Sequence, residues 1–216
     1  MNLAIYCAGN LGREIYDMAL RINDVCNRWK RIFFVDDIYT GNKYYGIDVY
    51  HIEKLPVKFD DVEFTIANGT PVHRANIFDK LKKFGATLAI MIDPTVVVSS
   101  SVSPPPGTIV FENVKISTNA NLGDNVLIQP GVYLPHDVKI GSHSVISVNV
   151  GIGGYSNIGK KCFLAMNSCI REHISIGENS IIGMGSVVLH DVSENSIYAG
   201  NPAKLIRNNY SGVIFR

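Results

Sequence analysis

Histidine side chains are the residues of this sequence best suited to moving protons near neutral pH, because the imidazole pKa lies close to that range. The sequence contains six: His51, His73, His136, His143, His173 and His190. His51 and His73 have no acidic or nucleophilic company that the pattern reveals, so we expect them at the surface or in turns. No Ser-His-Asp arrangement follows from the spacing, no metal cluster is evident, and carboxylates are too few in the repeats for a paired-acid hydrolase.

The later histidines lie in a hexapeptide repeat. The residue four places after each repeating aliphatic residue is nearly always small or β-branched. No helix has a period of six, and plain strands alternate with a period of two. Three short strands per turn of a triangular prism fit the pattern, which predicts a parallel β-helix of roughly four to five coils. The aliphatic residues that recur at every sixth position are Val110, Ile116, Leu122, Ile128, Leu134, Ile140, Ile146, Ile152, Ile158, Leu164, Ile170, Ile176, Ile182 and Val188.

Residues 18 apart lie in adjacent coils of such a β-helix, so columns of side chains follow from the sequence. In the column of His136 the next coil has Gly154, and we expect this gap to admit a flexible ligand arm to the imidazole. Small side chains in a second column would let a long, thin ligand lie on the backbone. Tight corners without a ligand would use the same small residues, so both interpretations stay open. That second column contains Gln129, Ser147, Ala165 and Gly183.

The first 95 residues alternate between strand and helix patterns. A helical pattern follows the first strand, and a second helix with proline at its start is expected over residues 71–84. Alternation of this kind is typical of a parallel sheet covered on both faces, here a truncated Rossmann-like α/β unit. The strands are expected at residues 3–7, 31–35, 62–66 and 87–92.

A possible anion site lies at the carboxyl edge of this sheet. Ligands bind there, and a glycine turn exposes backbone N–H groups at the start of a helix. A ligand-free turn would use the same glycines, and the acidic pair that ends the second strand could simply cap a turn. The domain is too short for a complete dinucleotide fold, which favours a smaller nucleotide group over NAD. The residues expected to bind it are Gly9, Asn10, Gly12, Asp36, Asp37 and Asn68.

Composition narrows the possibilities further. The chain has 216 residues and a formal net charge of +1, which gives no reason to expect nucleic acid or an anionic membrane as a partner. No signal peptide or membrane span is evident, so we expect a cytoplasmic protein. The pattern changes near residue 95, which predicts two domains, residues 1–95 and 96–216. The four cysteines lack metal-binding spacing and are expected to be reduced thiols.

Several runs of the sequence resemble a known family. LPHDVKIG (134–141), IGG (152–154), IGMGSVVLHD (182–191) and AGNPAK (199–204) are similar to the left-handed β-helix acyltransferases. AGNLGRE (8–14) and FVDD (34–37) narrow the resemblance. They resemble the subgroup with an N-terminal nucleotide-sugar domain, the N-acetyltransferases of bacterial UDP- or dTDP-linked amino sugars. That subgroup includes the bacillosamine-pathway enzyme and its sialic-acid O-acetyltransferase relatives.

The resemblance implies a homotrimer with active sites at subunit interfaces, taking acetyl-CoA along the β-helix and a nucleotide sugar from the N-terminal domain. The family's catalytic histidine and acidic residue correspond to His136 and Asp137. A carboxylate on one ring nitrogen would fix the tautomer and raise the basicity of the other. No metal is implied. The expected coenzyme A contacts, with Gly183 added from the small-residue column, are Gly153, Gly154, Ala165, Gly183, Pro202, Ala203 and Lys204.

The sequence also departs from that family. Many relatives have a second histidine where this chain has Val145, and residues 164–167 lack the usual glycines. Transfer to a hydroxyl, transfer of another acyl group, and a non-catalytic scaffold therefore remain alternatives to N-acetylation. Four aromatic residues occupy no inward slot of the repeat, and we expect a trimer interface to cover them. They are Phe111, Tyr133, Tyr155 and Phe163.

Overall fold

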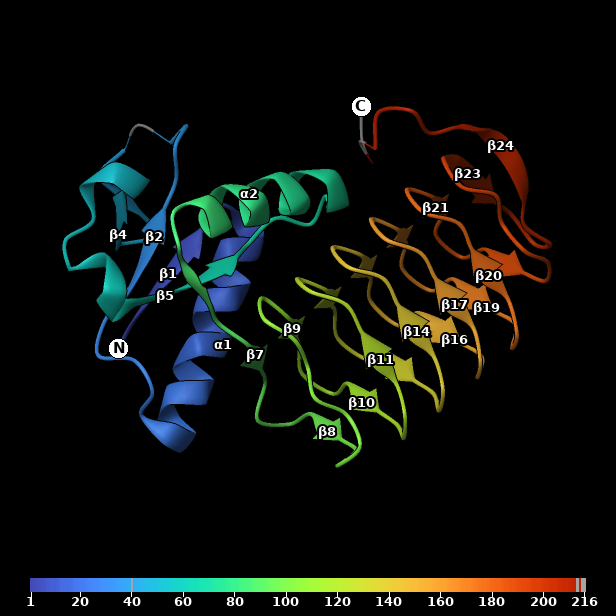
Figure 1. The fold of residues 1–216 in the computed structure, drawn as a ribbon, viewed down its shortest axis with the longest axis horizontal. Helices are drawn as coiled ribbons and strands as arrows, with labels where there is room; N and C mark the ends of the chain where they lie inside the picture. The colour runs from blue at the N-terminus through green and yellow to red at the C-terminus, as the bar shows by residue number, and fades with distance from the viewer. Residues whose placement is uncertain (40, 213, 215–216) are drawn as a thin grey trace.

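The N-terminal domain is a six-stranded sheet with one helix on each face. The computed structural model describes residues 1–39, 41–212 and 214 (Figure 1). The strand order is β3-β4-β2-β1-β5-β6, and the strands are parallel except for the β3–β4 pair. The expected Rossmann-like α/β unit is confirmed. Its elements are β1 (Asn2–Tyr6), α1 (Asn10–Cys26), β2 (Ile32–Val35), β3 (Lys43–Tyr44), β4 (Ile47–Tyr50), two 3-10 turns (Ile52–Lys54 and Phe59–Asp61), β5 (Val62–Ile66), α2 (Pro71–Lys83) and β6 (Thr87–Leu88).

The two helices cover opposite faces of this sheet. Apolar residues of α1 recur every three or four positions and bury Ile15 and Met18 against Leu3 and Ile5 of β1. Helix α2 starts at Pro71, where the missing N–H costs no hydrogen bond, and packs Phe78 on the other face. Within the described ranges, no helix combines the length and the apolar character needed to cross a membrane.

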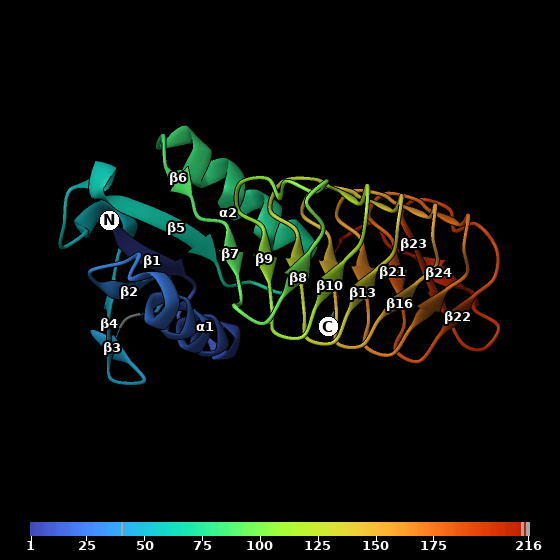
Figure 2. The same ribbon diagram turned by 90° about the horizontal axis from the view of Figure 1, so that it is seen from below.

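The C-terminal domain is a parallel β-helix whose short strands stack along one axis (Figures 1 and 2). Its three faces are named here by their first strands. The β7 face contains β7 (Met91–Ile92), β9 (Ile109–Val110), β12 (Leu127–Ile128), β15 (Val145–Ile146), β18 (Phe163–Leu164), β21 (Ile181–Ile182), β23 (Ser196–Ala199) and the antiparallel β24 (Lys204–Asn208). The β8 face contains β8 (Val97–Val98), β10 (Lys115–Ile116), β13 (Tyr133–Leu134), β16 (Gly151–Ile152), β19 (Cys169–Ile170) and β22 (Val187–Val188). The β11 face contains β11 (Asn121–Leu122), β14 (Lys139–Ile140), β17 (Asn157–Ile158) and β20 (Ser175–Ile176).

The repeating aliphatic residues form the interior of the prism, as the hexapeptide pattern predicts. The strand expected over residues 87–92 is in fact two elements. β6 pairs with β5 in the N-terminal sheet, whereas β7 pairs with β9 in the β-helix. The chain therefore passes from one sheet to the other between Leu88 and Met91.

Each corner of the prism contains one residue in the left-handed backbone conformation. Asparagine and glycine tolerate this conformation best, which explains why asparagine recurs at these sites. The hexapeptide pattern alone predicts no role for this corner position. The residues with positive φ are Asn113, Asn119, Asn125, Gly131, Asp137, His143, Asn149, Tyr155, Lys161, Asn167, His173, Asn179 and Gly185.

The N-terminal domain covers part of the β7 face. Phe111 is only 3% exposed, and Phe163 packs against the same cluster, which includes Ile15 and Met18 of α1. The expectation that these two aromatic residues mark a trimer interface is therefore wrong, because α1 already covers them within one chain. Tyr133 and Tyr155 remain exposed, as expected.

Arg74 of α2 forms hydrogen bonds that link the two domains. Its guanidinium is fully buried and donates to the backbone oxygens of Ile66, Asn68 and Asn125, and to the side chain of Asn125. Burial lowers the pKa of Arg74 to about 9, so the group keeps its charge at neutral pH. These bonds fix the loop after β5 against a corner of the β-helix.

Candidate active site

His136 and Asp137 form a hydrogen-bonded pair at the corner between the β8 and β11 faces. The distance from Nδ1 of His136 to Oδ2 of Asp137 is 3.0 Å, and Asn119 donates to Oδ1 of the same carboxylate at 3.2 Å. Hydrogen bonds from His136 and then Asn119 hold the pKa of Asp137 below its usual range. An ionised Asp137 accepts a hydrogen bond from Nδ1–H, and in that tautomer Nε2 is the lone-pair nitrogen. The imidazole is half exposed, so Nε2 is available for proton transfer.

The gap expected beside His136 is filled by the imidazole itself. A Cβ added to Gly154 would lie 2.9 Å from Cε1 and 3.0 Å from Nε2 of His136. Gly153 is equally constrained, because its Cβ would lie 2.2 Å from the backbone nitrogen of Glu172. Approach of a ligand arm to the imidazole stays a prediction, because the ring is half exposed. Both glycines are required by packing within the chain, and Gly154 lets the ring lie flat against the next coil.

The column of small residues lines a cavity of about 580 Å³ beside the N-terminal domain. This column follows the strands of the β7 face, so it lies at the corner between the β7 and β8 faces. Leu11 and Glu14 from α1, with Gly69 and Thr70 from the loop after β5, close the other side. Sequence reasoning identified the column but missed these partners. The members that line the cavity are Gln129, Ser147, Ala165 and Gly183.

The AGNPAK run, residues 199–204, spans the turn from the end of β23 to the start of β24. Pro202 and Lys204 are exposed, and the backbone N–H of Ala203 donates to Val187 of the β8 face. The Cβ of Ala199 would lie 2.8 Å from a Cβ placed on Gly183. The motif therefore lies at the far end of the prism, next to the small-residue column.

A second cavity, of about 750 Å³, lies at the carboxyl edge of the N-terminal sheet. Asp36, Asp37 and Asn68 line it, as expected. Gly9, Asn10 and Gly12 do not line it; they form the adjacent turn and the first turn of α1. Gly12 has a packing role, since a Cβ there would lie 2.6 Å from the backbone oxygen of Cys7. The backbone N–H groups at the start of α1 meet no capping side chain, which suits an anion.

The two acidic residues of this cavity have different partners. Asp36 accepts hydrogen bonds from the backbone nitrogens of Ala8, Ile38 and Tyr39, so it orders the loop after β2 as a turn cap. Asp37 instead accepts from Lys80 at 2.6 Å.

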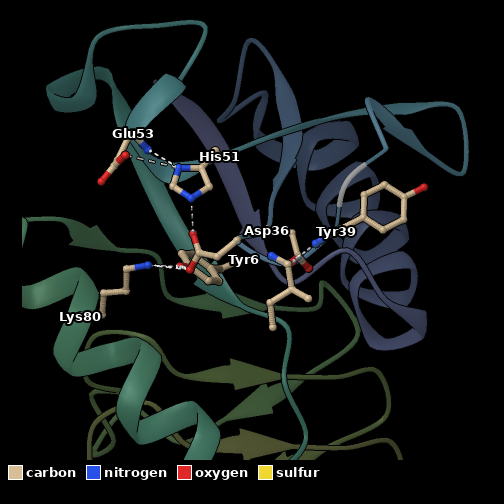
Figure 3. A network of polar contacts seen from close by, with 8 residues as sticks. Tyr6, Asp36, Tyr39, His51, Glu53 and Lys80 are labelled. Atoms are coloured by element: carbon tan, nitrogen blue, oxygen red, sulfur yellow. Dashed lines mark hydrogen bonds and ion pairs between the residues drawn. The ribbon is translucent and has the colours of Figure 1, made fainter.

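Tyr6, His51 and Lys80, which Figure 3 labels, come from different parts of the N-terminal domain and meet at the carboxylate of Asp37. Tyr6 donates to its carboxylate, and His51 lies 3.6 Å from it. His51 therefore has acidic neighbours, Asp37 and Glu53, contrary to expectation. Burial alone would raise the pKa of Asp37, but hydrogen bonds from Lys80 and Tyr6 outweigh it and lower that pKa. Tyr6 and Lys80 escaped the sequence reading because only the fold brings them to Asp37.

The other groups offer less for catalysis. His143 lies at the domain interface, with Nδ1 3.0 Å from Nδ2 of Asn125 and its ring against Phe78, and burial lowers its pKa. His173 stacks on Tyr155 at a centroid distance of 4.9 Å. Among the described residues, no group of three or more His, Cys, Asp or Glu side chains could hold a metal ion. Cys7, Cys26, Cys162 and Cys169 are free thiols.

Both domains match known family models. Residues 2–81 match the PglD N-terminal domain, and residues 119–154 and 155–190 each match the bacterial transferase hexapeptide model with six repeats. The chain belongs to the PglD-type hexapeptide-repeat acetyltransferase family, so the resemblance seen in the sequence is confirmed. A comparison with curated proteins gives no match.

Solved structures share the whole fold. The acetyltransferase domain of PglB from Neisseria gonorrhoeae FA1090 superposes with a TM-score of 0.87 at 24% identity, covering 95% of this chain and 99% of that chain. The same domain in complex with acetyl coenzyme A gives a TM-score of 0.59 at 22% identity, covering 95% and 98%. A histidine-to-alanine mutant of GDP-perosamine N-acetyltransferase from Caulobacter crescentus, in complex with CoA and GDP-perosamine, gives 0.87 at 23% identity, covering 96% and 98%.

Proposed function

We propose that the chain is an acetyl-CoA-dependent N-acetyltransferase that acts on the amino group of a nucleotide-linked amino sugar, with His136 as general base. The observation that carries this proposal is the His136–Asp137 pair, in which a carboxylate holds Nδ1 at 3.0 Å while the half-exposed ring offers Nε2. A scaffold protein has no need of such a pair. The complexes of the related proteins with CoA, acetyl-CoA and GDP-perosamine support the same class of reaction.

The chemistry of the pair is a single proton relay. The sugar amine attacks the thioester carbonyl, an N–C bond forms, and Nε2 of His136 takes the proton that the amine loses. Asp137 stabilises the imidazolium through Nδ1. The C–S bond then breaks, and the imidazolium returns the proton to the departing thiolate, giving the amide and free CoA. A sugar hydroxyl could use the same base, so O-acetylation is an outcome that the assay below separates.

The two cavities fit the two ends of a nucleotide sugar. Cys7 and Ala8 line the 750 Å³ cavity, whereas Leu11 lines the 580 Å³ cavity. In the loop after β5, Asn68 lines the larger cavity and its neighbour Gly69 lines the smaller one. The two loops thus run from one cavity to the other. We infer that the nucleoside occupies the larger cavity, the diphosphate crosses the start of α1, and the sugar points toward the small-residue column.

The small-residue column fits the pantetheine arm of acetyl-CoA, because Ala165 and Gly183 offer backbone beside a cavity with little side chain in the way. Bound acetyl-CoA would supply the thioester carbonyl that the amine attacks. This column and His136 lie at opposite edges of the β8 face, whose outward Tyr133 and Val97 are exposed. We infer that a trimer packs these faces together, so that one chain's His136 meets the neighbour's column. Gly153, Gly154, Pro202, Ala203 and Lys204 remain predicted CoA contacts.

A panel of UDP-, dTDP- and GDP-linked amino sugars tests the reaction directly. Each is incubated with acetyl-CoA and the full chain, and free thiol is followed with a colorimetric reagent. We expect release with at least one 4-amino sugar and none with the matching hydroxyl sugar. Release with the hydroxyl sugar alone would establish O-acetylation, and no release above hydrolysis with any of them would contradict the proposed activity.

Titration of the full chain with UDP, dTDP and GDP tests the nucleotide site. We expect Asn68→Ala to weaken the best ligand about tenfold, the loss of roughly one hydrogen bond to a charged or polar group. Lys83→Ala, at the exposed end of α2, is the matched control and should bind as the parent does. If calorimetry detects no binding of any of the three nucleotides, the N-terminal domain does not bind the nucleotide sugar.

A further inference from the structure

The corner that carries His136 and Asp137 contains a column of four polar side chains, one from each successive coil. Asn119, Asp137, Tyr155 and His173 have φ angles of 58°, 58°, 60° and 61°. Asn119 donates to Asp137 at 3.2 Å, across a separation of 18 residues. Tyr155 and His173 continue the column with parallel rings, 4.9 Å between centroids and 5° apart in orientation.

Tyrosine is an unexpected residue at this position. The left-handed conformation is uncommon and unfavourable for bulky side chains, in contrast to asparagine and glycine, which tolerate it. Most other corners in the described part of the β-helix use asparagine or glycine. Tyr155 is also 55% exposed, so its ring contributes little to the core of the prism. An unfavourable backbone conformation that buries little of the side chain points to a role of that side chain in the adjacent site.

That site is the His136–Asp137 pair. The edge of the Tyr155 ring meets the imidazole of His136 at a centroid distance of 5.1 Å and an angle of 78°. This is the edge-to-face geometry that aromatic pairs prefer. Tyr155 also contributes to the lowered pKa of Asp137. Tyr155 therefore contacts the imidazole and follows Asp137 in the same column, while Gly154, which has no side chain, leaves room for the ring.

We propose that Tyr155 is a positioning residue, which restrains the imidazole of His136 in the orientation that keeps Nδ1 on Asp137 and leaves Nε2 for the substrate. The proposal rests on the proposed function in one respect, that His136 is the base. Rotation of a histidine ring about its last side-chain bond has only weak intrinsic preferences, so a half-exposed ring needs outside contacts to hold one orientation. Asn119 and the aspartate fix one edge of the ring, and Tyr155 limits its swing. His173 in turn supports the Tyr155 ring by stacking.

Two substitutions separate positioning from folding. Tyr155→Asn places the residue best suited to this backbone and removes the ring contact with His136, so thermal stability should be unchanged or higher. Tyr155→Phe keeps the ring and removes only the hydroxyl. The matched control is Lys161→Asn, which makes the same backbone improvement at φ 54° in another corner, where the side chain pairs with Glu178 at 3.5 Å.

The first measurement is nitrogen NMR of the full chain labelled at histidine, which reports the tautomer of His136 without any substrate. The parent and Lys161→Asn should show one Nδ1-protonated imidazole, Tyr155→Asn a mixture of tautomers, and Tyr155→Phe an intermediate pattern. The second is kcat with the best amino sugar. We expect Tyr155→Asn to lower kcat about tenfold with KM nearly unchanged, because the loss is in orientation of the base.

A single tautomer and full kcat in Tyr155→Asn would overturn the proposal. So would an equal loss of kcat in Lys161→Asn, because the effect would then belong to the backbone. The NMR result stands whether or not His136 proves to be the base. If His136→Ala is fully active while Tyr155→Asn still shows mixed tautomers, the proposed base is wrong and the restraint by Tyr155 is not.

Discussion

Replacing His136 by alanine is expected to lower kcat by about 10²- to 10⁴-fold, the usual cost of removing a positioned base. The fold should survive, because the imidazole is half exposed and lies outside the aliphatic interior. The measurement is steady-state acetyl transfer to the best amino sugar, with thermal unfolding and light scattering to confirm an intact oligomer. KM for both substrates should change little, because Nε2 acts mainly in the transition state.

His190→Ala is the matched control. His190 lies in the same column of the β-helix as His136 but is exposed and has no carboxylate contact among the described hydrogen bonds. We expect it to retain near-parental activity. Near-full activity of His136→Ala would contradict the assignment and turn attention to His143 or His173. His143 is the weaker candidate for the general base, because Asn125 and Phe78 enclose its ring at the domain interface.

The sequence predicts the β-helix well because its periodicity is tied directly to geometry. An aliphatic residue at every sixth position can point inward only if three short strands complete a turn, and the sheets pair residues in that register, as with Leu127 and Val145. The His136–Asp137 pair was equally accessible, since the two residues are adjacent in the chain. Local pattern and local chemistry are thus readable without coordinates.

Contacts between distant segments were not readable. Lys80 and Tyr6 reach Asp37 only after α2 folds onto the sheet. Phe111 appears to be an outward aromatic residue in the repeat, yet α1 covers it. The 18-residue spacing correctly places Gly154 beside His136. It does not predict that the imidazole itself occupies the space above Gly154, because the spacing gives the position of a Cα atom and not the direction of a ring.

Mixing two inactive variants is expected to restore activity if the site is shared between chains. His136→Ala lacks the base, and Ala165→Trp places an indole in the 580 Å³ cavity, so each variant alone should be nearly inactive. His136 and Ala165 lie at opposite edges of the β8 face, which favours a site that takes them from two neighbouring chains. In randomly assembled trimers about one quarter of the shared interfaces would join an intact His136 to an intact Ala165.

Co-expression of the two variants with different affinity tags, followed by tandem purification, isolates the mixed trimers. We expect about a third of parental activity per site, because each mixed trimer has one intact interface of three, against almost none for either variant alone. The control is a chain carrying both substitutions, mixed with either single variant, which should restore no activity because every chain then lacks the same half of the site. Light scattering reports the assembly in each case. Full activity in a monomeric fraction, or no recovery in verified mixed trimers, would show that base and small-residue column act within one chain.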